Sequence, residues 1–394
     1  MASSMKKTVG VLFGGNSVEH EVSVISANQA MHALNKDKYS VVPIYITKDG
    51  RFFTSEELFD IAKYKDIPAL LERCEEVIIK KGSGRAELVV LKTKMFSKPK
   101  VTEIDIFIPV VHGTNVEDGT LQGYLEMMGV PYCGCDVTSS ALGMDKYAMK
   151  CVLKDAGVNV LDAISFYAKE YYKDRDAVLD RIEEKIGYPV IIKPVNLGSS
   201  VGIKKASDRA SLVEAVDSAA TFSPRVLAER AIEDLKEVNC SVLGDYEEAE
   251  TSVLEEPVNA DEILSYDDKY RGGGKGMSGS TRKVPAEVTD EQEKAIRSMC
   301  MTTFKALGCS GVARIDVMID KKSGEIFVNE INTIPGSLSF YLWEAAGVSF
   351  EALMDKIIYY GEKRFREREK LNFSYDTNLL SELGARGLKS GVKK

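Results

Sequence analysis

The pattern of apolar and polar positions at the start of the chain is typical of a parallel sheet covered by helices. An apolar run at residues 7–15 ends in a Gly-Gly pair, and residues 16–34 carry apolar side chains at helical spacing behind Ser17, the expected cap. The runs at 39–47 and 105–113 predict further strands. We therefore expect an α/β unit over the first 130 residues or so, with the charged, aperiodic stretch 73–100 as a surface excursion.

The rest of the chain predicts two more groups of elements. We expect one helix from 139 to 157, a strand at 188–195 running into a Gly/Ser loop, and a strand at 225–232. Beyond a helix at 290–307, strands at 311–320 and 325–332 flank Lys-Lys-Ser-Gly and predict a β-hairpin, and an amphipathic helix follows at 351–370. We expect domains at 1–134, 135–232 and 233–394, the last with a mobile loop at about 265–285 and a disordered polar tail.

Composition narrows the functional classes. The 394 residues are 44% hydrophobic and 28% charged with a formal net charge of -8, which indicates a globular protein and argues against nucleic acid as a partner. We find no apolar run of about 18 residues and no signal-peptide core, so we expect no membrane contact and a cytoplasmic location. The seven cysteines lack zinc-site spacing, and three histidines leave little room for histidine-based metal chemistry.

The predicted hairpin carries polar side chains with period two. Arg314 and Asp316 share one strand face, opposite an apolar face, and Glu330 and Asn332 share a face of the partner strand. Carboxylates and an amide oxygen are the hard ligands that Mg²⁺ prefers when substrate phosphates also bind it. The alternative is a solvated sheet face, but the Pro-Gly turn that follows favours a cleft.

A second set of residues suits phosphate binding. Lys193 ends an apolar strand and precedes a Gly-Ser-Ser-Val-Gly loop, which offers a cation and backbone amides to phosphate oxygens. Lys146 is a second candidate cation, Glu229 ends the next strand, and Glu237 is a candidate for a ribose hydroxyl. Taken singly, each has a simpler interpretation as an ordinary turn or a solvated charge.

Polar residues also follow the N-terminal strands. His112 stands at a strand end, Glu117 and Asp118 open a helix whose dipole favours them, and Glu19 lies in the first strand-to-helix turn. Ligands bind at such carboxyl ends of strands in open α/β sheets.

Seven motifs, in order, resemble those of the D-alanine:D-alanine ligases of the ATP-grasp superfamily, from about Val9 to about Gly361. They are LFGGNSVEHEVS, HGTNVEDGTLQG, MDKYAMK, IIKPVNLGSSVGI, DDKYRG, ARIDVM and NEINTIPG. The resemblance implies three domains, the first Rossmann-like, with an α+β C-terminal part and with ATP held between the central and C-terminal domains.

The resemblance also implies roles for individual residues. Catalysis is assigned to Glu19, Ser199, Tyr270, Arg314 and Gly336. ATP contacts are assigned to Lys146, Lys193, Ser199, Ser200, Glu229, Glu237, Lys269, Asn329 and Glu330. Substrate contacts are assigned to Glu19, His112, Ser199, Arg314, Asn332, Gly336, Tyr341 and Leu342. Two Mg²⁺, with Mn²⁺ as a possible substitute, are assigned to Asp316, Glu330 and Asn332.

The implied reaction joins two D-alanine molecules through an acyl phosphate, with ADP and phosphate as co-products, for peptidoglycan precursors, in a homodimeric enzyme. Two departures from the family pattern stand out. The loop after Lys269-Tyr270 is long and rich in glycine, and Tyr341 replaces the usual serine that holds the second substrate's carboxylate. The alternatives are therefore a D-serine or other amino-acid acceptor, and a non-catalytic nucleotide-binding protein, which would be expected to have lost residues such as Lys193 and Asp316.

Overall fold

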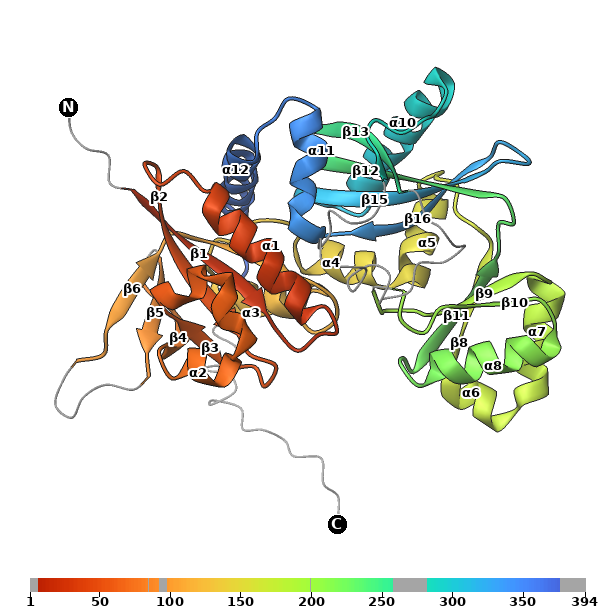
Figure 1. The fold of residues 1–394 in the computed structure, drawn as a ribbon, viewed down its shortest axis with the longest axis horizontal. Coiled ribbons are helices and arrows are strands. Elements are labelled where there is room, and N and C mark those ends of the chain that lie inside the picture. The colour runs from red at the N-terminus through yellow and green to blue at the C-terminus, as the bar shows by residue number, and fades with distance from the viewer. Residues whose placement is uncertain (1–5, 84, 92–97, 199, 258–281, 376–394) are drawn as a thin grey trace, which may run out of the picture.

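The computed structural model describes residues 6–83, 85–91, 98–198, 200–257 and 282–375. Three sheets follow one another along the chain and form three layered units (Figure 1). The strands are β1 (Lys7–Gly14), β2 (Tyr39–Ile46), β3 (Phe52–Thr54), β4 (Glu75–Lys81), β5 (Ala86–Val90), β6 (Val101–Ile104), β7 (Ile106–Val111), β8 (Ala163–Tyr167), β9 (Val190–Pro194), β10 (Lys204–Ala206), β11 (Arg225–Arg230), β12 (Leu235–Gly244), β13 (Ala249–Pro257), β14 (Arg282–Lys283), β15 (Gly311–Asp320) and β16 (Ile326–Asn332).

Helices cover these sheets and connect them. The α-helices are α1 (His20–Ala33), α2 (Ile67–Leu71), α3 (Thr120–Met128), α4 (Val137–Met144), α5 (Lys146–Asp155), α6 (Ala168–Lys173), α7 (Arg175–Lys185), α8 (Arg209–Ala220), α10 (Asp290–Ala306), α11 (Phe340–Ala345) and α12 (Phe350–Arg368). Short 3-10 helices are η1 (Glu56–Phe59), η2 (Ile61–Lys65) and η4 (Gly336–Ser339). No helix of the described residues is long and apolar enough to cross a bilayer.

The N-terminal sheet has the order β6-β5-β4-β3-β2-β1-β7, with β1 parallel to both β2 and β7 as predicted. The prediction of a surface excursion at 73–100 is wrong, because β4 and β5 extend the sheet there with antiparallel pairing. Val77 and Ile79 point into the core while Ile78 and Lys80 point outward. Charged residues on the outer face concealed this alternation.

Two local predictions need correction. Helix α1 begins at His20 with Glu19 at the cap position, and the Ser17 hydroxyl instead accepts a hydrogen bond from the Glu19 N–H at 3.1 Å. The single helix expected at 139–157 is two helices, α4 and α5, which meet at Asp145. The Asp145 backbone is extended and its carboxylate caps α5 by accepting from the Ala148 N–H, so a new helix starts there.

The central sheet has the order β10-β9-β11-β8, and α6, α7 and α8 cover it (Figure 1). The C-terminal sheet has the order β14-β13-β12-β15-β16, and its last two strands form the predicted antiparallel hairpin. Ala313, Ile315 and Val317 are buried on one hairpin face, as the period-two pattern predicted. The opposite hairpin face, which carries the polar side chains, is therefore the one that can contact a ligand.

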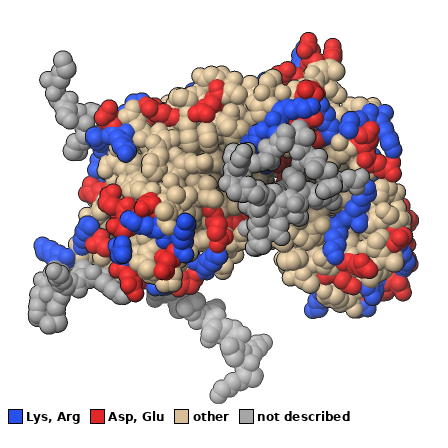
Figure 2. Space-filling model, viewed as in Figure 1, with Lys and Arg blue, Asp and Glu red and all other residues tan. Residues whose placement is uncertain are grey.

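Packing joins the units across long stretches of sequence. Leu353 and Ile357 of α12 are buried in the same core as Val11 of β1, so the C-terminal helix packs on the N-terminal sheet. Met149 of α5 lies in the core of the C-terminal sheet. On the face visible in Figure 2, acidic and basic side chains are interspersed over the described surface.

Candidate active site

A cavity of about 750 Å³ lies between the central and C-terminal sheets. Strands β9 and β11 supply one wall, and β12, β15 and β16 supply the other. Sequence-predicted site residues that line it are Lys193, Ser200, Glu229, Glu237, Arg314, Asp316, Asn329 and Glu330. The structure thus brings together most of the residues expected to bind ATP. A cavity of this volume suits a cofactor-sized ligand.

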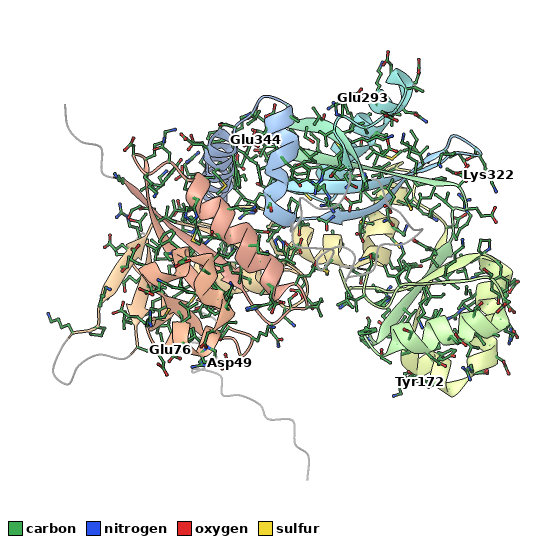
Figure 3. The ribbon with its side chains drawn as sticks, viewed as in Figure 1. Asp49, Glu76, Tyr172, Glu293, Lys322 and Glu344 are labelled. Atoms are coloured by element: carbon green, nitrogen blue, oxygen red, sulfur yellow. The ribbon has the colours of Figure 1, made fainter. Side chains whose placement is uncertain are left out.

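Three residues of the polar hairpin face, Arg314, Asp316 and Glu330, line this cavity. Figure 3 shows Lys322 at the turn of the same hairpin. Asp316 pairs in register with Glu330, and Arg314 with Asn332. Arg314 donates to both carboxylate oxygens of Asp316, at 2.6 and 2.8 Å, and the Asn332 amide donates to Asp316 at 3.1 Å. The predicted grouping of these four side chains is confirmed.

Lys146 belongs to the same cluster although it comes from helix α5. Its ammonium lies 3.2 Å from a Glu330 carboxylate oxygen and donates to the Leu197 carbonyl at 2.9 Å. The carbonyl belongs to the start of the Gly/Ser loop, so Lys146 connects this loop to the hairpin. Lys146 is only 6% exposed, so water screens its charge weakly and its attraction for a bound anion is strong.

A buried group of three charges, Lys150, Lys193 and Glu229, lies at the cavity, and its members Lys193 and Glu229 line it. Glu229 is 1% exposed and pairs with Lys193 through one oxygen and with Lys150 at 3.0 Å through the other. Lys193 also donates to the Asn329 side-chain oxygen at 3.1 Å. Burial would raise the pKa of Glu229, but the two lysines outweigh it and lower that pKa to about 2.

The sequence analysis missed Lys150. Its signal was its spacing of four from Lys146, which places both ammonium groups on one face of α5. One Glu229 carboxylate therefore faces two lysines, of which Lys193 lines the cavity and can meet a phosphate.

The predicted metal ligands are of the right chemical kind. Asp316, Glu330 and Asn332 offer two carboxylates and one amide oxygen, which suit Mg²⁺ when phosphate oxygens complete its coordination. Among the described residues there is no group of three or more His, Cys, Asp or Glu side chains that could hold a metal alone. The residues therefore fit a metal shared with a phosphate ligand, not an all-protein site.

Glu19 reaches the Gly/Ser loop from the N-terminal unit. A Cβ added at Gly198 would lie 2.8 Å from a Glu19 carboxylate oxygen, and one added at Gly113 would lie 2.8 Å from the same oxygen. Glycine at both positions leaves room for the carboxylate. Ser199 follows Gly198 directly but, like Lys269 and Tyr270, lies outside the described residues.

His112 and Glu117 hold the two backbone polar groups of one residue, Ile334, in the segment after the hairpin. His112 Nδ1 lies 2.9 Å from the Ile334 carbonyl oxygen, and its Nε2 lies 2.9 Å from the Ser26 hydroxyl. The Glu117 carboxylate accepts from the N–H groups of Ile334 and Gly113, each at 2.9 Å. Both side chains therefore fix the backbone just before Gly336.

The charge states of these two residues follow from their burial. Burial lowers the pKa of His112 to about 4, so the ring is neutral at pH 7. Burial and the nearby Glu19 raise the pKa of Glu117 to about 7, although Gly113, Ile334 and Thr333 act in the opposite direction. The helix-dipole interpretation of Glu117 is wrong, because α3 begins only at Thr120 and the carboxylate faces Ile334.

The segment that starts at Gly336 has an unusual backbone. Ser337, Leu338 and Ser339 all have φ between 51° and 53°, a left-handed conformation that costs energy in non-glycine residues, and all three are buried. The Ser337 N–H donates to the Ser26 hydroxyl at 2.9 Å. The surrounding contacts thus hold Gly336 in a defined place.

Tyr341 and Leu342 occupy different environments. The Tyr341 hydroxyl donates to Glu255 at 2.9 Å, which the sequence did not predict. The Leu342 side chain is fully buried, so any contact of this residue with a ligand falls to its backbone.

Comparisons with known proteins agree with this architecture. Family profiles described as D-ala D-ala ligase N-terminus and C-terminus match residues 8–135 and 152–359. The D-alanine–D-alanine ligase of Thermosipho melanesiensis is 39% identical over 94% of this chain and 98% of its own. The VanG D-Ala:D-Ser ligase of Enterococcus faecalis superposes with a TM-score of 0.74 and 31% identity over 91% of this chain and 100% of its own. The D-alanine–D-alanine ligase of Bacillus anthracis, solved with ATP, gives 0.64 and 26% over 92% and 99%.

The three sheets and the cavity between the second and third define an ATP-grasp enzyme, an ATP-dependent ligase that forms a peptide bond. More particularly, the chain belongs to the D-alanine–D-alanine ligase family.

Proposed function

We propose that the protein joins two molecules of D-alanine into D-alanyl-D-alanine at the expense of ATP. The carboxylate of the first D-alanine attacks the γ-phosphate of ATP and forms an acyl phosphate, and ADP leaves. The amine of the second D-alanine then attacks the acyl carbon, and phosphate leaves as the peptide bond forms. The observation that carries the proposal is the single cavity in which Lys193, Arg314, Asp316 and Glu330 meet.

The cations of this cavity suit the first step. Phosphoryl transfer depends on positioning and on neutralising phosphate charge more than on covalent help from the protein. Lys146 and Lys193 are buried and contact neighbouring residues of the hairpin strand β16, Lys146 at Glu330 and Lys193 at Asn329. We assign both lysines to the phosphates of ATP.

Asp316, Glu330 and Asn332 would hold two Mg²⁺, for which Mn²⁺ is a possible substitute. Bound there, the metals would supply further charge neutralisation for the phosphates. Ser200 and Asn329 complete the assigned phosphate contacts, and Glu229 and Glu237 are assigned to the adenosine part.

The amino-acid end of the site lies toward the N-terminal unit. Glu19 is assigned to the ammonium group of the first D-alanine, because its carboxylate reaches the Gly/Ser loop. Arg314 and the Gly336 N–H are assigned to the oxyanion formed when the amine attacks. His112 acts by holding the Ile334 carbonyl, two residues before Gly336. Assigned from the sequence alone are Ser199, Lys269 and Tyr270.

A second candidate acceptor is D-serine. The structural similarity to a D-Ala:D-Ser ligase and the presence of Tyr341 in the segment after Gly336 favour testing it. A non-catalytic nucleotide-binding role is disfavoured, because Lys193, Asp316, Glu330 and Asn332 are all retained.

One assay separates these functions. Purified protein is supplied with ATP, Mg²⁺ and single or paired D- and L-amino acids, phosphate release is followed, and the product is identified by mass. D-alanine-dependent phosphate release with D-alanyl-D-alanine as product supports the proposal. If D-serine is preferred over D-alanine as the acceptor, the second candidate function is supported instead. If no pair of amino acids stimulates phosphate release, both ligase functions are excluded.

We further propose the cellular setting that follows from this activity. The product would serve peptidoglycan precursor synthesis in the cytoplasm, and the enzyme would work as a homodimer on small-molecule substrates without nucleic acid or membrane. We also propose domain limits at residues 134 and 232.

A further inference from the structure

A buried carboxylate near the cavity connects Tyr341, a predicted substrate contact, with Asn239 and Arg282, which have no assigned role. Glu255 of β13 is 3% exposed and accepts from the Tyr341 hydroxyl at 2.9 Å and from the Asn239 amide at 3.2 Å. Its other oxygen lies 3.2 Å from the Arg282 guanidinium. The Arg282 guanidinium carbon lies 4.5 Å from the centre of the Tyr341 ring. We call Glu255, Tyr341 and Arg282 the Glu255 cluster.

The register of the C-terminal sheet places this cluster in line with the proposed metal ligands. Glu255 faces Asn239, Asn239 faces Asp316, and Asp316 faces Glu330 across four neighbouring strands. Residues directly opposite each other in adjacent strands share one face of a sheet. A continuous polar row therefore crosses the sheet from the Glu255 cluster to Glu330.

This row is the border between two parts of the sheet face. On one side, Glu237 and Met318 line the nucleotide cavity. On the other side, Ser241 accepts a hydrogen bond from the Trp343 indole of α11 at 3.0 Å, so α11 covers the sheet there. Tyr341 belongs to the same helix and reaches the row at Glu255.

The direction of attack follows if the proposed function holds, and the present inference rests on that function. The amine must approach the acyl carbon from a side that the departing phosphate does not occupy. We place the nucleotide in the cavity and the acyl carbon beside Arg314. The side of the acyl carbon that faces away from the phosphate is then the side on which Tyr341 lies. Arg314 and Tyr341 are close enough to interact electrostatically. The acceptor therefore meets the Glu255 cluster.

The hydroxyl of Tyr341 is poorly suited to bind the carboxylate of that acceptor. A phenol has one proton, and Tyr341 donates it to Glu255. Burial and Glu255 raise the pKa of Tyr341 to about 12, so the group remains a neutral phenol at pH 7. Only oxygen lone pairs remain for a ligand, and these repel a carboxylate.

A guanidinium is the better partner for that carboxylate. Arg282 has five N–H donors, and its pairing with Glu255 and its contact with the face of the Tyr341 ring set its direction. Arg314 uses two donors on Asp316 and is already assigned to the oxyanion.

We propose that Arg282 is the specificity-determining residue that binds the α-carboxylate of the acceptor amino acid. Glu255 is the positioning residue that aims Arg282, and Tyr341 contributes its ring as the surface on which the guanidinium lies.

The test compares two acceptors, D-alanine and D-alaninamide, with D-alanine as the donor. The amide has the same amine and nearly the same size but no carboxylate, and it cannot act as a donor. Dipeptide and dipeptide amide are quantified by mass at saturating ATP. We expect the wild-type protein to prefer D-alanine, and Arg282→Met to lower that preference roughly 10- to 100-fold, the range of a charge-assisted hydrogen bond. The KM for ATP should not change.

Three further variants divide the roles. Glu255→Gln should raise the acceptor KM without changing the ATP KM, and Glu255→Asp should restore part of the preference. Tyr341→Phe should keep the preference within about threefold, because the hydroxyl binds Glu255 and not the substrate. Arg51→Met is the matched control, since its guanidinium pairs with Asp49 in the N-terminal unit, away from the cavity (Figure 3).

The outcomes distinguish this inference from the proposed function. No dipeptide from the wild-type protein would overturn both. Dipeptide from the wild type together with an unchanged preference in Arg282→Met would overturn the inference alone. If Tyr341→Phe lost the preference for D-alanine over D-alaninamide and Arg282→Met kept it, the acceptor carboxylate would be bound by the Tyr341 hydroxyl and not by Arg282. Unchanged ATP KM and circular dichroism in Arg282→Met show that a lost preference is not a loss of folding.

Discussion

The buried group of Lys150, Glu229 and Lys193 allows a prediction about stability that depends only on its geometry. Glu229 shares its two oxygens between the two lysines, and all three side chains are at most 8% exposed. Removing the shared carboxylate should therefore cost more than removing one lysine. The two changes to compare are Glu229→Gln and Lys150→Met, both nearly isosteric.

The magnitudes follow from what each change leaves buried. Lys150→Met removes one charged hydrogen bond but leaves Glu229 paired with Lys193, so we expect a loss of about 1.5–3 kcal/mol. Glu229→Gln leaves two neighbouring lysines without a countercharge. Breaking a buried pair in this way costs about 3–5 kcal/mol. The glutamine variant should be the less stable of the two.

The assay is thermal and urea denaturation of the ATP-free protein, followed by circular dichroism. Lys154→Met is the matched control on the same helix, since Lys154 is half exposed and pairs with Asp162 at 3.1 Å. Its loss should cost at most about 1 kcal/mol. If Lys150→Met destabilised the protein as much as Glu229→Gln, or if Glu229→Gln behaved like Lys154→Met, the shared-carboxylate argument would be refuted.

The same group predicts a pH dependence. The pKa of Glu229 is about 2 in the folded protein and 4.5 in its ordinary state, so its ion pairs stabilise the protein above pH 4.5. That contribution is lost as the pH falls from 4.5 toward 2. The stability difference between the wild type and Glu229→Gln should therefore shrink over this range, and a constant difference would contradict the assignment.

Three further changes test other parts of the structure. Glu330→Gln should lower kcat at least about 100-fold in steady-state assays, because its carboxylate compensates charge in the transition state. The control Glu325→Gln, at the exposed turn of the same hairpin, should leave kcat unchanged. One thiol, that of Cys151, should react quickly with a thiol reagent in the folded protein, since the other cysteines are buried or partly buried, and Cys151→Ser should abolish the fast phase. Glu117→Gln should cost about 1–3 kcal/mol in urea unfolding, because an NH₂ would face a backbone N–H. The folded pKa of Glu117 is raised from 4.5 to about 7, so the wild type's advantage should decrease as the pH rises from 4.5 to 7, and an increase would contradict the assignment.

The parts of the site that lie close together in the sequence could be predicted from it. The short turn brings β15 and β16 side by side, and the period of two fixes which side chains of one strand share a face. The sequence did not show the one-residue register shift between Asp316 and Val317, which pairs Asp316 with Glu330. The resemblance to a known family supplied most of the remaining residues. The expected excursion at 73–100 failed because the charges of β4 and β5 lie on the outer face and obscure the strand period.

The residues that the sequence analysis missed have partners in other elements. Lys150 binds Glu229, and Glu255 binds Tyr341 86 residues away. In the sequence such a residue looks the same as a solvated charge, because only the tertiary contact shows that it is buried and paired. The same reason explains Glu117, which an adjacent helix seemed to account for although its partner is the Ile334 N–H, 217 residues away.

None of the described residues that line the cavity comes from the N-terminal unit. This unit nevertheless holds the backbone around Gly336. His112 and Glu117 hold the carbonyl and the N–H of Ile334, and Ser26 binds both His112 and the Ser337 N–H. These contacts enclose Gly336, whose neighbours have a left-handed backbone that an isolated segment would not keep. The oxyanion donor proposed at Gly336 would therefore be positioned by Ser26 of α1 and by the segment that connects β7 to α3.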